Sequence, residues 1–230
     1  MRQKRFQRGA SPKIELTEKD FYILKTVNTH RFIRSTHLCA LLRSTQYPLR
    51  RLGQLYHAGL LDRPKLQIQY YKSGSEPMVY AMTTKGAKLL GIQKRVEDVD
   101  KHPSHHLFRH TLSLTDFMIR MEVSATKAGL PFQRLPIEEW KTNLFYEGKR
   151  ITRRVIPDAV FTLGDKVYFV ENDTGTMPLS RVKNAYQTSI LKKQTIYKEA
   201  WKNNAFPFPN LRVIFYTNSQ ECSHAVFTLL

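Results

Sequence analysis

The chain has 230 residues, with 37 Lys or Arg against 19 Asp or Glu, so its formal net charge is +18. A positive surplus of this size predicts attraction to a polyanion, above all to nucleic acid. No apolar run approaches the roughly 18 residues that a membrane-spanning helix needs, and the two cysteines, Cys39 and Cys222, suit neither a zinc site nor a disulfide framework. We therefore expect a cytoplasmic protein with no membrane partner.

The positive charge is concentrated in the first part of the chain. Residues 1–91 hold 17 basic and 5 acidic residues, a net charge of +12, whereas residues 92–230 hold 20 and 14, a net charge of +6. Within the first part, residues 1–13 carry basic side chains, no acid, and the helix breakers Gly9 and Pro12. This composition predicts a basic disordered arm, which either lies along DNA phosphates or is an inert solvated tail.

Residues 14–91 alternate between helical and strand patterns. Thr17 followed by Asp20 resembles a capping box at the start of a first helix. A second short helix fits residues 35–42, and a third runs from about residue 45 to residue 57, before Gly59. Alternating apolar residues at 66–70, a turn, and an apolar run at 78–82 predict a hairpin, and a further helix is expected at 83–90.

Three helices, a two-stranded wing and another helix follow the order of a winged helix-turn-helix domain. Ala-Gly-Leu-Leu-Asp-Arg at 58–63 and Tyr-Ala-Met-Thr-Thr-Lys-Gly at 80–86 look like that family. The resemblance implies that the third helix enters the major groove of double-stranded DNA. The alternative is an ordinary solvated face on a protein-binding domain. The side chains expected to face DNA are Ser44, Gln46, Tyr47, Arg50, Arg51 and Gln54, with Lys72 at the wing tip.

Residues 92–104 are polar and contain Pro103, which predicts a linker before a long amphipathic helix at 105–127. His106 and His110 lie four residues apart on that helix and therefore share a face. No cysteine or carboxylate at a known zinc spacing accompanies them, so structural or phosphate-facing roles are favoured over zinc binding.

Two apolar runs, 153–163 and 166–171, meet at Gly164-Asp165, which predicts two antiparallel strands joined by a tight turn. Counting from the turn puts Asp158 opposite Glu171, and Glu171 shares a face with Asp173. Three carboxylates are thus expected to converge, and crowded carboxylates repel unless a cation or a proton lies between them. In a chain this basic we expect a site for Mg²⁺ or Mn²⁺ that acts on a phosphodiester.

The remaining elements complete a domain over residues 105–230. The patterns predict a strand at 134–140, a basic helix at about 179–202 and a buried strand at 211–217. Helix, three strands, helix and strand, in that order, place the last strand beyond a crossover helix in a mixed sheet. The expected fold class is α/β, in its α+β form.

This order, with Pro157-Asp158 on one strand and Glu171-Asn-Asp173 on the next, resembles the PD-(D/E)XK nuclease superfamily. In that superfamily the Asp and Glu hold a divalent metal, and a Lys two residues after the Glu helps to activate water. Asp173 stands at the Lys position here. A Lys or Arg from the following helix, Lys183 or Arg181, is expected to substitute for it.

A closer resemblance is to the replication-relaxation family, which includes MobC-like plasmid mobilisation relaxases. It is carried by Pro157-Asp158-Ala159, by Glu171-Asn-Asp-Thr-Gly-Thr, and by a following basic helix that bears Tyr186, and it spans about residues 16–217. It implies a winged-helix front joined to a nuclease-like rear, in a DNA nickase or relaxase. Asp158, Glu171 and Asp173 would hold Mg²⁺ or Mn²⁺, Lys183 would stabilise developing charge, and water or Tyr186 would attack the phosphodiester.

Two other functions stay open beside the metal-dependent nickase. The first is a replication or transcription regulator that binds DNA without cutting it, its acidic residues serving only to pair with Arg153 and Arg154. The second is a scaffold that recruits replication or mobilisation proteins. Winged-helix proteins often form homodimers, although no heptad pattern here indicates one.

Overall fold

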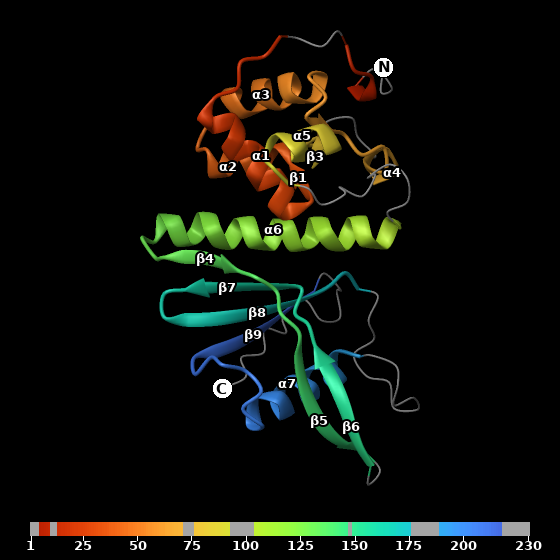
Figure 1. The fold of residues 1–230 in the computed structure, drawn as a ribbon, viewed down its shortest axis with the longest axis vertical. Helices are drawn as coiled ribbons and strands as arrows, with labels where there is room; N and C mark the ends of the chain where they lie inside the picture. The colour runs from red at the N-terminus through yellow and green to blue at the C-terminus, as the bar shows by residue number, and fades with distance from the viewer. Residues whose placement is uncertain are drawn as a thin grey trace. The chain divides into compact units, whose positions relative to one another are not determined.

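The computed structural model describes residues 5–9, 13–70, 76–92, 104–146, 149–175 and 189–217. Helices and strands are mixed along the chain, which confirms the α+β class expected from the sequence (Figure 1). The chain divides into two compact units, residues 1–123 and 124–230. Within the described residues, no helix combines the length and the apolar character that crossing a membrane requires.

Unit 1 consists of helices and a small antiparallel sheet. The sheet has the order β1-β3-β2, with β3 paired to both neighbours. Buried apolar side chains from α1, α2, α3 and the sheet form one core, in which Ile23, Leu24, Leu52 and Leu55 are fully buried. The elements of this unit are α1 (Glu18–His30), β1 (Phe32–Arg34), α2 (Ser35–Leu41), α3 (Gln46–His57), β2 (Leu61–Asp62), α4 (Gln67–Tyr70), β3 (Val79–Met82) and α5 (Thr84–Leu89).

Helix α6 (His105–Lys127) packs against unit 1 along most of its length. The Phe108 ring lies edge-on to Phe32 at 4.9 Å, and the Thr115 hydroxyl donates to the Phe32 carbonyl at 3.0 Å. Asp116 accepts hydrogen bonds from Arg34 and from His37. The boundary between the units therefore falls inside α6, between residues 123 and 124, whereas the sequence placed it in the linker at 92–104. Most of that linker lies outside the described residues.

The first helix begins as the sequence predicts. The Asp20 carboxylate accepts from the Thr17 backbone N–H at 2.8 Å, which is the return bond of a capping box. Asp20 is fully buried, and its two oxygens accept from Arg51 Nε at 2.7 Å and Nη2 at 2.6 Å. This paired hydrogen bond connects the start of α1 to the middle of α3.

The expected strand at residues 66–70 is wrong, because this segment contains the short helix α4. The buried Gln67 side chain explains the difference. Its oxygen accepts from the Val79 N–H at 2.8 Å, and its amide nitrogen donates to the carbonyls of Val79 and Pro64. One side chain thus satisfies backbone groups of β3 that a strand would otherwise pair with. The partner strand of β3 on this side is β2, which begins at Leu61.

The expected disordered arm at residues 1–13 also needs correction where it is described. Residues 5–9 lie against the end of α3 and β2. Arg8 donates to the carbonyls of Tyr56 and Leu61 and to the Asp62 carboxylate, at 2.9–3.1 Å. The Gly9 N–H donates to His57 Nδ1 at 2.9 Å. Arg8 is therefore exposed but hydrogen-bonded to unit 1.

Unit 2 contains a four-stranded sheet in the order β4-β7-β8-β9 and a separate two-stranded ribbon, β5-β6 (Figure 1). The pairs β4-β7 and β7-β8 are antiparallel, and β8-β9 is parallel, so α7 forms the crossover that the sequence predicts. The elements are β4 (Phe132–Leu135), β5 (Trp140–Tyr146), β6 (Lys149–Val155), β7 (Ala159–Leu163), β8 (Lys166–Asp173), α7 (Ile190–Lys202) and β9 (Leu211–Thr217).

The central hairpin has the predicted turn but a shorter first strand. Leu163 pairs with Lys166 across Gly164-Asp165, and Gly164 has φ +62°, a conformation that glycine adopts without strain. The run 153–163 is not one strand, because it breaks at residues 156–158 into β6 and β7. Pro157 lies at the break and has no N–H to donate to a ladder. The predicted strand at 134–140 is likewise divided between β4 and the start of β5.

An aromatic core joins α7 and the ribbon to one face of the sheet. Phe169 of β8 lies 4.7 Å from the Trp140 ring and 5.2 Å from the Phe206 ring. Tyr197 of α7 is buried in the same cluster. This packing fixes α7 over β8, and it brings the polar side chains of α7 to the end of that strand.

Candidate carboxylate site and nucleic-acid interface

Asp158 and Glu171 lie opposite each other at one end of the β7-β8 hairpin. Ala159 pairs with Val170, and the Asp158 N–H also donates to the Val170 carbonyl at 2.8 Å, which holds Asp158 against β8 just before the regular ladder begins. The Asp158 carboxylate accepts from the Asn172 N–H at 2.8 Å, which holds it against β8. The juxtaposition of these two residues is the one that counting from the turn predicts.

The Glu171 carboxylate is buried, with 5% of the residue exposed, and both of its oxygens are hydrogen-bonded from α7. The Tyr197 hydroxyl donates to Oε1 at 2.6 Å, and the Lys193 ammonium donates to Oε2 at 2.5 Å. Lys193 and Tyr197 are four residues apart, so they share one face of the helix. The Ser189 hydroxyl caps the start of α7 by accepting from the Lys192 N–H at 3.3 Å.

The acidities of this cluster are shifted by burial and by the neighbouring charges. Burial raises the pKa of Glu171, Lys193 acts against that rise, and the Asp158 charge adds to it. Burial and the Glu171 carboxylate raise the pKa of Tyr197 well above its ordinary value. The phenol therefore stays a hydrogen-bond donor to the Glu171 carboxylate.

Asp173 does not complete the expected three-carboxylate site. Its Oδ2 accepts from the Thr217 hydroxyl at 3.3 Å, across the parallel β8-β9 pair. In the part of the chain that the structure describes, no three His, Cys, Asp or Glu residues come together in a group that could hold a metal ion. Asp158 and Glu171 remain as a pair. Two carboxylates are a donor set that Mg²⁺ accepts, because it keeps several of its waters, so the pair fits this ion.

Arg154 is expected from the sequence to pair with the acidic cluster, but its described ion pair is with a different residue, Glu139. Its guanidinium lies 3.5 Å from Glu139, and 71% of its side chain is exposed. The cation that Glu171 contacts is Lys193 instead. Lys183, Arg181 and Tyr186, which the sequence put forward for catalysis, lie outside the described residues.

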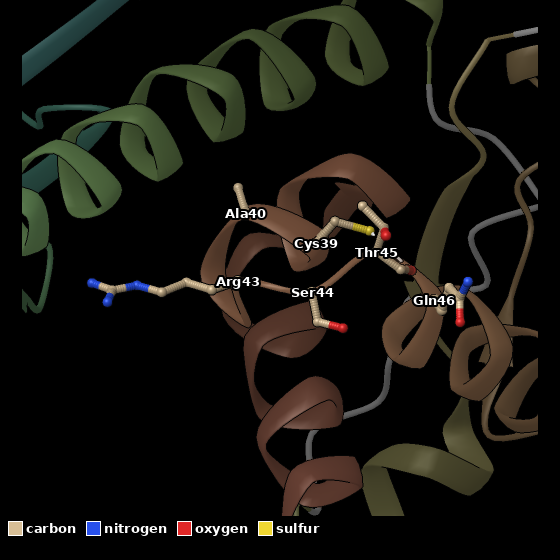
Figure 2. Close-up of a pocket in the computed structure, with 6 residues that line it drawn as sticks. All are labelled: Cys39, Ala40, Arg43, Ser44, Thr45 and Gln46. Atoms are coloured by element: carbon tan, nitrogen blue, oxygen red, sulfur yellow. Dashed lines mark hydrogen bonds between the residues drawn. The ribbon is translucent and has the colours of Figure 1, made fainter.

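The second candidate site is the turn between α2 and α3. Figure 2 shows an open pocket there, in which Arg43 extends away from the other five lining side chains. Cys39 points inward and donates weakly to the Thr45 carbonyl at 3.7 Å, and burial raises the pKa of its thiol. The lining residues are Cys39, Ala40, Arg43, Ser44, Thr45 and Gln46.

The predicted DNA-facing side chains of this region divide into two groups. Gln46 and Arg50 are exposed on α3, and Ser44 is half-buried at the pocket. Tyr47 is held at the α1 start, where its hydroxyl lies 3.3 Å from that of Thr17.

Arg51 and Gln54 belong to the second group, which is used within unit 1. Arg51 contacts Asp20, donates to the Glu15 carbonyl at 2.9 Å and donates to Gln54 at 2.8 Å. Both side chains are therefore engaged in contacts within unit 1, in place of the expected DNA contacts. Lys72, the expected wing-tip contact, lies outside the described residues.

A family model described as replication-relaxation matches residues 24–206. The chain belongs to the replication-relaxation family. The matched range begins in α1 and ends after α7, so it covers both candidate sites. Neither the curated proteins nor the solved structures contain a match to the chain.

Membership of the replication-relaxation family indicates a role in the replication or mobilisation of plasmids or other mobile elements. Within this family member, Lys193 and Tyr197 are the site residues that sequence reasoning missed. A signal was present: Ile190, Tyr197 and Ala200 are buried at helical spacing, and Lys193 interrupts the same stripe. A lysine within an apolar stripe needs a buried partner, and Glu171 is that partner.

Proposed function

We propose that the protein binds double-stranded DNA of a plasmid or another mobile element and nicks it with a divalent metal. In this proposal unit 1 works as a winged helix-turn-helix domain and unit 2 as a PD-(D/E)XK-like nuclease. The observation that supports it best is the convergence of Asp158, Glu171 and Lys193 from two strands and a helix. Two carboxylates and a lysine are the residue types that the superfamily resemblance requires, with the lysine supplied by α7.

Each residue of this cluster has a distinct part. Asp158 and Glu171 would hold Mg²⁺ or Mn²⁺, which when bound polarises a phosphate oxygen and makes water more acidic. Lys193 supplies positive charge beside the scissile phosphate, where negative charge develops during attack. Tyr197 is a positioning residue, because its hydroxyl fixes the orientation of the Glu171 carboxylate through a 2.6 Å bond. The group that attacks the phosphodiester is either water or Tyr186, and only attack by Tyr186 leaves a DNA end bound to the protein.

DNA binding by unit 1 is supported by charge and exposure. The net charge of +12 over residues 1–91 predicts affinity for a polyanion. Gln46 and Arg50 lie exposed on α3, next to the open pocket at the α2-α3 turn. A helix presented in this way can enter the major groove, where Arg and Gln side chains read base edges.

The nicking proposal is tested on supercoiled plasmid with Mg²⁺ or Mn²⁺. We expect Asp158→Asn, Glu171→Gln and Lys193→Met each to lower the nicking rate by on the order of 10²-fold or more. The first two substitutions remove a carboxylate that would hold the metal, and the third removes a donor to developing negative charge. Asp165→Asn and Lys198→Met are matched controls, since both residues are exposed in the same unit. Nicking that survives the three site variants would remove this assignment. A protein-bound 5′ or 3′ DNA end would show covalent attack.

The second candidate function is a DNA-binding regulator that does not cut. It is favoured by the two bonds that Glu171 already receives, since they compensate its charge within the fold. Calorimetric titration with Mn²⁺ separates the two functions. The nickase predicts binding that Asp158→Asn weakens, whereas the regulator predicts no metal binding and DNA affinity unchanged by the same substitution.

A further inference from the structure

The β5-β6 ribbon has two chemically different faces. It is paired only within itself among the described residues, and it extends away from the four-stranded sheet (Figure 1). On its inner face Trp140 and Val155 are buried in the aromatic core of unit 2, and the buried Thr142 hydroxyl accepts from Asn203, the residue after α7, at 3.4 Å. The base of the ribbon is therefore firmly attached to α7.

The outer face is exposed and basic. Lys141 lies directly opposite Arg154, and Arg150 lies four residues before Arg154 in the same strand, on the same face. All three residues are exposed. Asn143 and Thr152 lie between them and bond to each other at 3.0 Å. The described side chains of this face are thus polar or positively charged.

No acidic residue in either strand of the ribbon compensates its positive charge. The two strands together contain five Lys or Arg and no Asp or Glu. Among the described contacts, Arg154 has the distant 3.5 Å pairing with Glu139, and a pair this exposed contributes little. A two-stranded sheet that keeps three cations exposed on one face presents a charged surface, and no described element of unit 2 pairs with its strands.

We propose that the outer face of the β5-β6 ribbon, through Lys141, Arg150 and Arg154, is a second DNA-binding surface that contacts the phosphates of a duplex. Four residues of strand span about 13 Å, a length over which one DNA strand presents about four phosphates along the axis. A two-stranded ribbon also fits the major groove in width. The inference rests on the DNA binding of the proposed function and is independent of nicking.

Other partners fit this face less well. A peripheral membrane contact needs several apolar or aromatic residues beside the basic ones. Of the six residues at outer-face positions of the register, five are basic or polar, and Phe145, opposite Arg150, is apolar. A stable protein interface likewise has an apolar centre within a polar rim. Phosphates need only exposed cations, which this face provides.

The test is DNA affinity as a function of salt, measured by fluorescence anisotropy in EDTA with a duplex of about 30 base pairs and about 50 to 300 mM KCl. The variant is Lys141→Ala/Arg150→Ala/Arg154→Ala. The matched control, Lys127→Ala/Lys166→Ala/Lys198→Ala, removes the same charge from exposed positions elsewhere in unit 2. A third protein, Lys141→Arg/Arg150→Lys/Arg154→Lys, keeps the charge and tests whether the side chains act structurally.

We expect the ribbon variant to reduce the slope of log K against log salt by about 2 to 3, and to weaken binding near 0.1 M salt by on the order of 10²-fold. The control and the charge-preserving protein should keep the wild-type slope. Equal slopes for the ribbon variant and the control would overturn the inference alone, whereas a wild-type chain that does not bind DNA would overturn the proposed function as well. Binding to phosphatidylserine vesicles that needs the three residues, with DNA binding that does not, would assign the face to a membrane instead.

Discussion

Arg51 occupies a position on α3 that favours DNA contact, yet its guanidinium lies against a buried carboxylate. Burial alone would raise the pKa of Asp20, but the hydrogen bonds from Arg51 and Thr17 outweigh burial, and the pKa is lowered. The carboxylate is thus kept ionised, and the pair holds α1 and α3 together. Removing one member of such a pair is costly, because the other charge is left buried without a partner.

Asp20→Asn should therefore destabilise the protein by about 3 kcal/mol at neutral pH. Because the folded pKa lies below the ordinary value of 3.8, the stability from Asp20 is complete above that value and is lost as the pH falls through the folded pKa. The difference between variant and wild type should stay constant at higher pH and shrink below about pH 3.8. Urea unfolding at several pH values measures this, with the exposed Asp165→Asn as control. A difference independent of pH would contradict it.

Two glycines of unit 1 should respond to alanine in opposite directions. A Cβ on Gly86 would lie 2.3 Å from the Leu60 carbonyl oxygen and 2.5 Å from the Met82 sulfur, and the backbone oxygen cannot easily move. A Cβ on Gly53, within α3, would meet nothing within 4 Å. We expect Gly86→Ala to lower the free energy of unfolding by about 2 kcal/mol, and Gly53→Ala to raise it by up to about 1 kcal/mol. Thermal melting of both variants checks the signs, and a stable Gly86→Ala protein would show that α5 packs less closely on β2.

At the scale of elements, the N-terminal segment 5–9 is attached to α3 and β2 by contacts that its amino-acid composition does not predict. The Arg8 guanidinium reaches two carbonyls and a carboxylate and lies 5.0 Å from the centre of the Tyr56 ring. From the sequence alone, Arg8 is a candidate for contact with a DNA phosphate. In the structure its guanidinium instead donates hydrogen bonds to acceptors at the end of α3 and in β2. A basic residue in a terminal segment can therefore either contact DNA or attach that segment to the rest of the fold.

Arg8→Ala should release this segment without unfolding unit 1. We expect a loss of about 1 kcal/mol, since the side chain is partly exposed and its hydrogen bonds are screened. The sharper readout is hydrogen exchange at the Gly9 amide, whose bond to His57 should open more often. Lys13→Ala, at another exposed basic position, is the control. Unchanged protection of Gly9 would mean that His57 alone is enough to hold the segment.

Elements defined by local chemistry could be predicted from the sequence, and those defined by distant partners could not. The Gly164-Asp165 turn and the Thr17-Asp20 cap depend on neighbouring residues, and both are confirmed. The strand expected at 66–70 failed because the Gln67 side chain bonds to Val79, twelve residues away, and no periodicity reports such a contact. Of the candidate site, the facing of Asp158 and Glu171 followed from counting residues.

The same argument applies to the lysine of the site. The sequence motif directs attention to the position two residues after Glu171, which is Asp173, and then to the nearest basic residues, at 181 and 183. Lys193 lies ten residues after Lys183 in the sequence and reaches Glu171 only because α7 packs over β8. Its position depends on packing between elements, which a single sequence pattern does not report.

At the scale of the whole molecule, the α3 surface proposed to read DNA and the cluster proposed to nick it belong to different units. The net charge of +12 in the first 91 residues and the exposed α3 side chains support DNA binding by unit 1. The Asp158, Glu171 and Lys193 cluster lies within unit 2. Sites without shared contacts usually respond to substitution independently. Binding and nicking should therefore be separable.

Arg50→Ala should weaken DNA binding by about tenfold and reduce the salt slope by about 1, while nicking at saturating DNA stays near the wild-type rate. Asp158→Asn should do the reverse, leaving affinity within about twofold and abolishing nicking. Fluorescence anisotropy gives the DNA affinity of each variant, and plasmid nicking gives its cleavage rate. Equal losses of affinity in both variants would mean that the carboxylate cluster also holds the DNA, or that the substitution disturbs the fold.

The anchoring of residues 5–9 has a practical consequence for labelling. Because Arg8 is bonded to the Leu61 carbonyl and Gly9 to His57, residues 5–9 lie beside the last turn of α3. A fluorophore attached to a side chain of this segment would be held close to that helix. Such a probe would sense events at the neighbouring helix, and an unlabelled protein is the proper reference for any affinity that it reports.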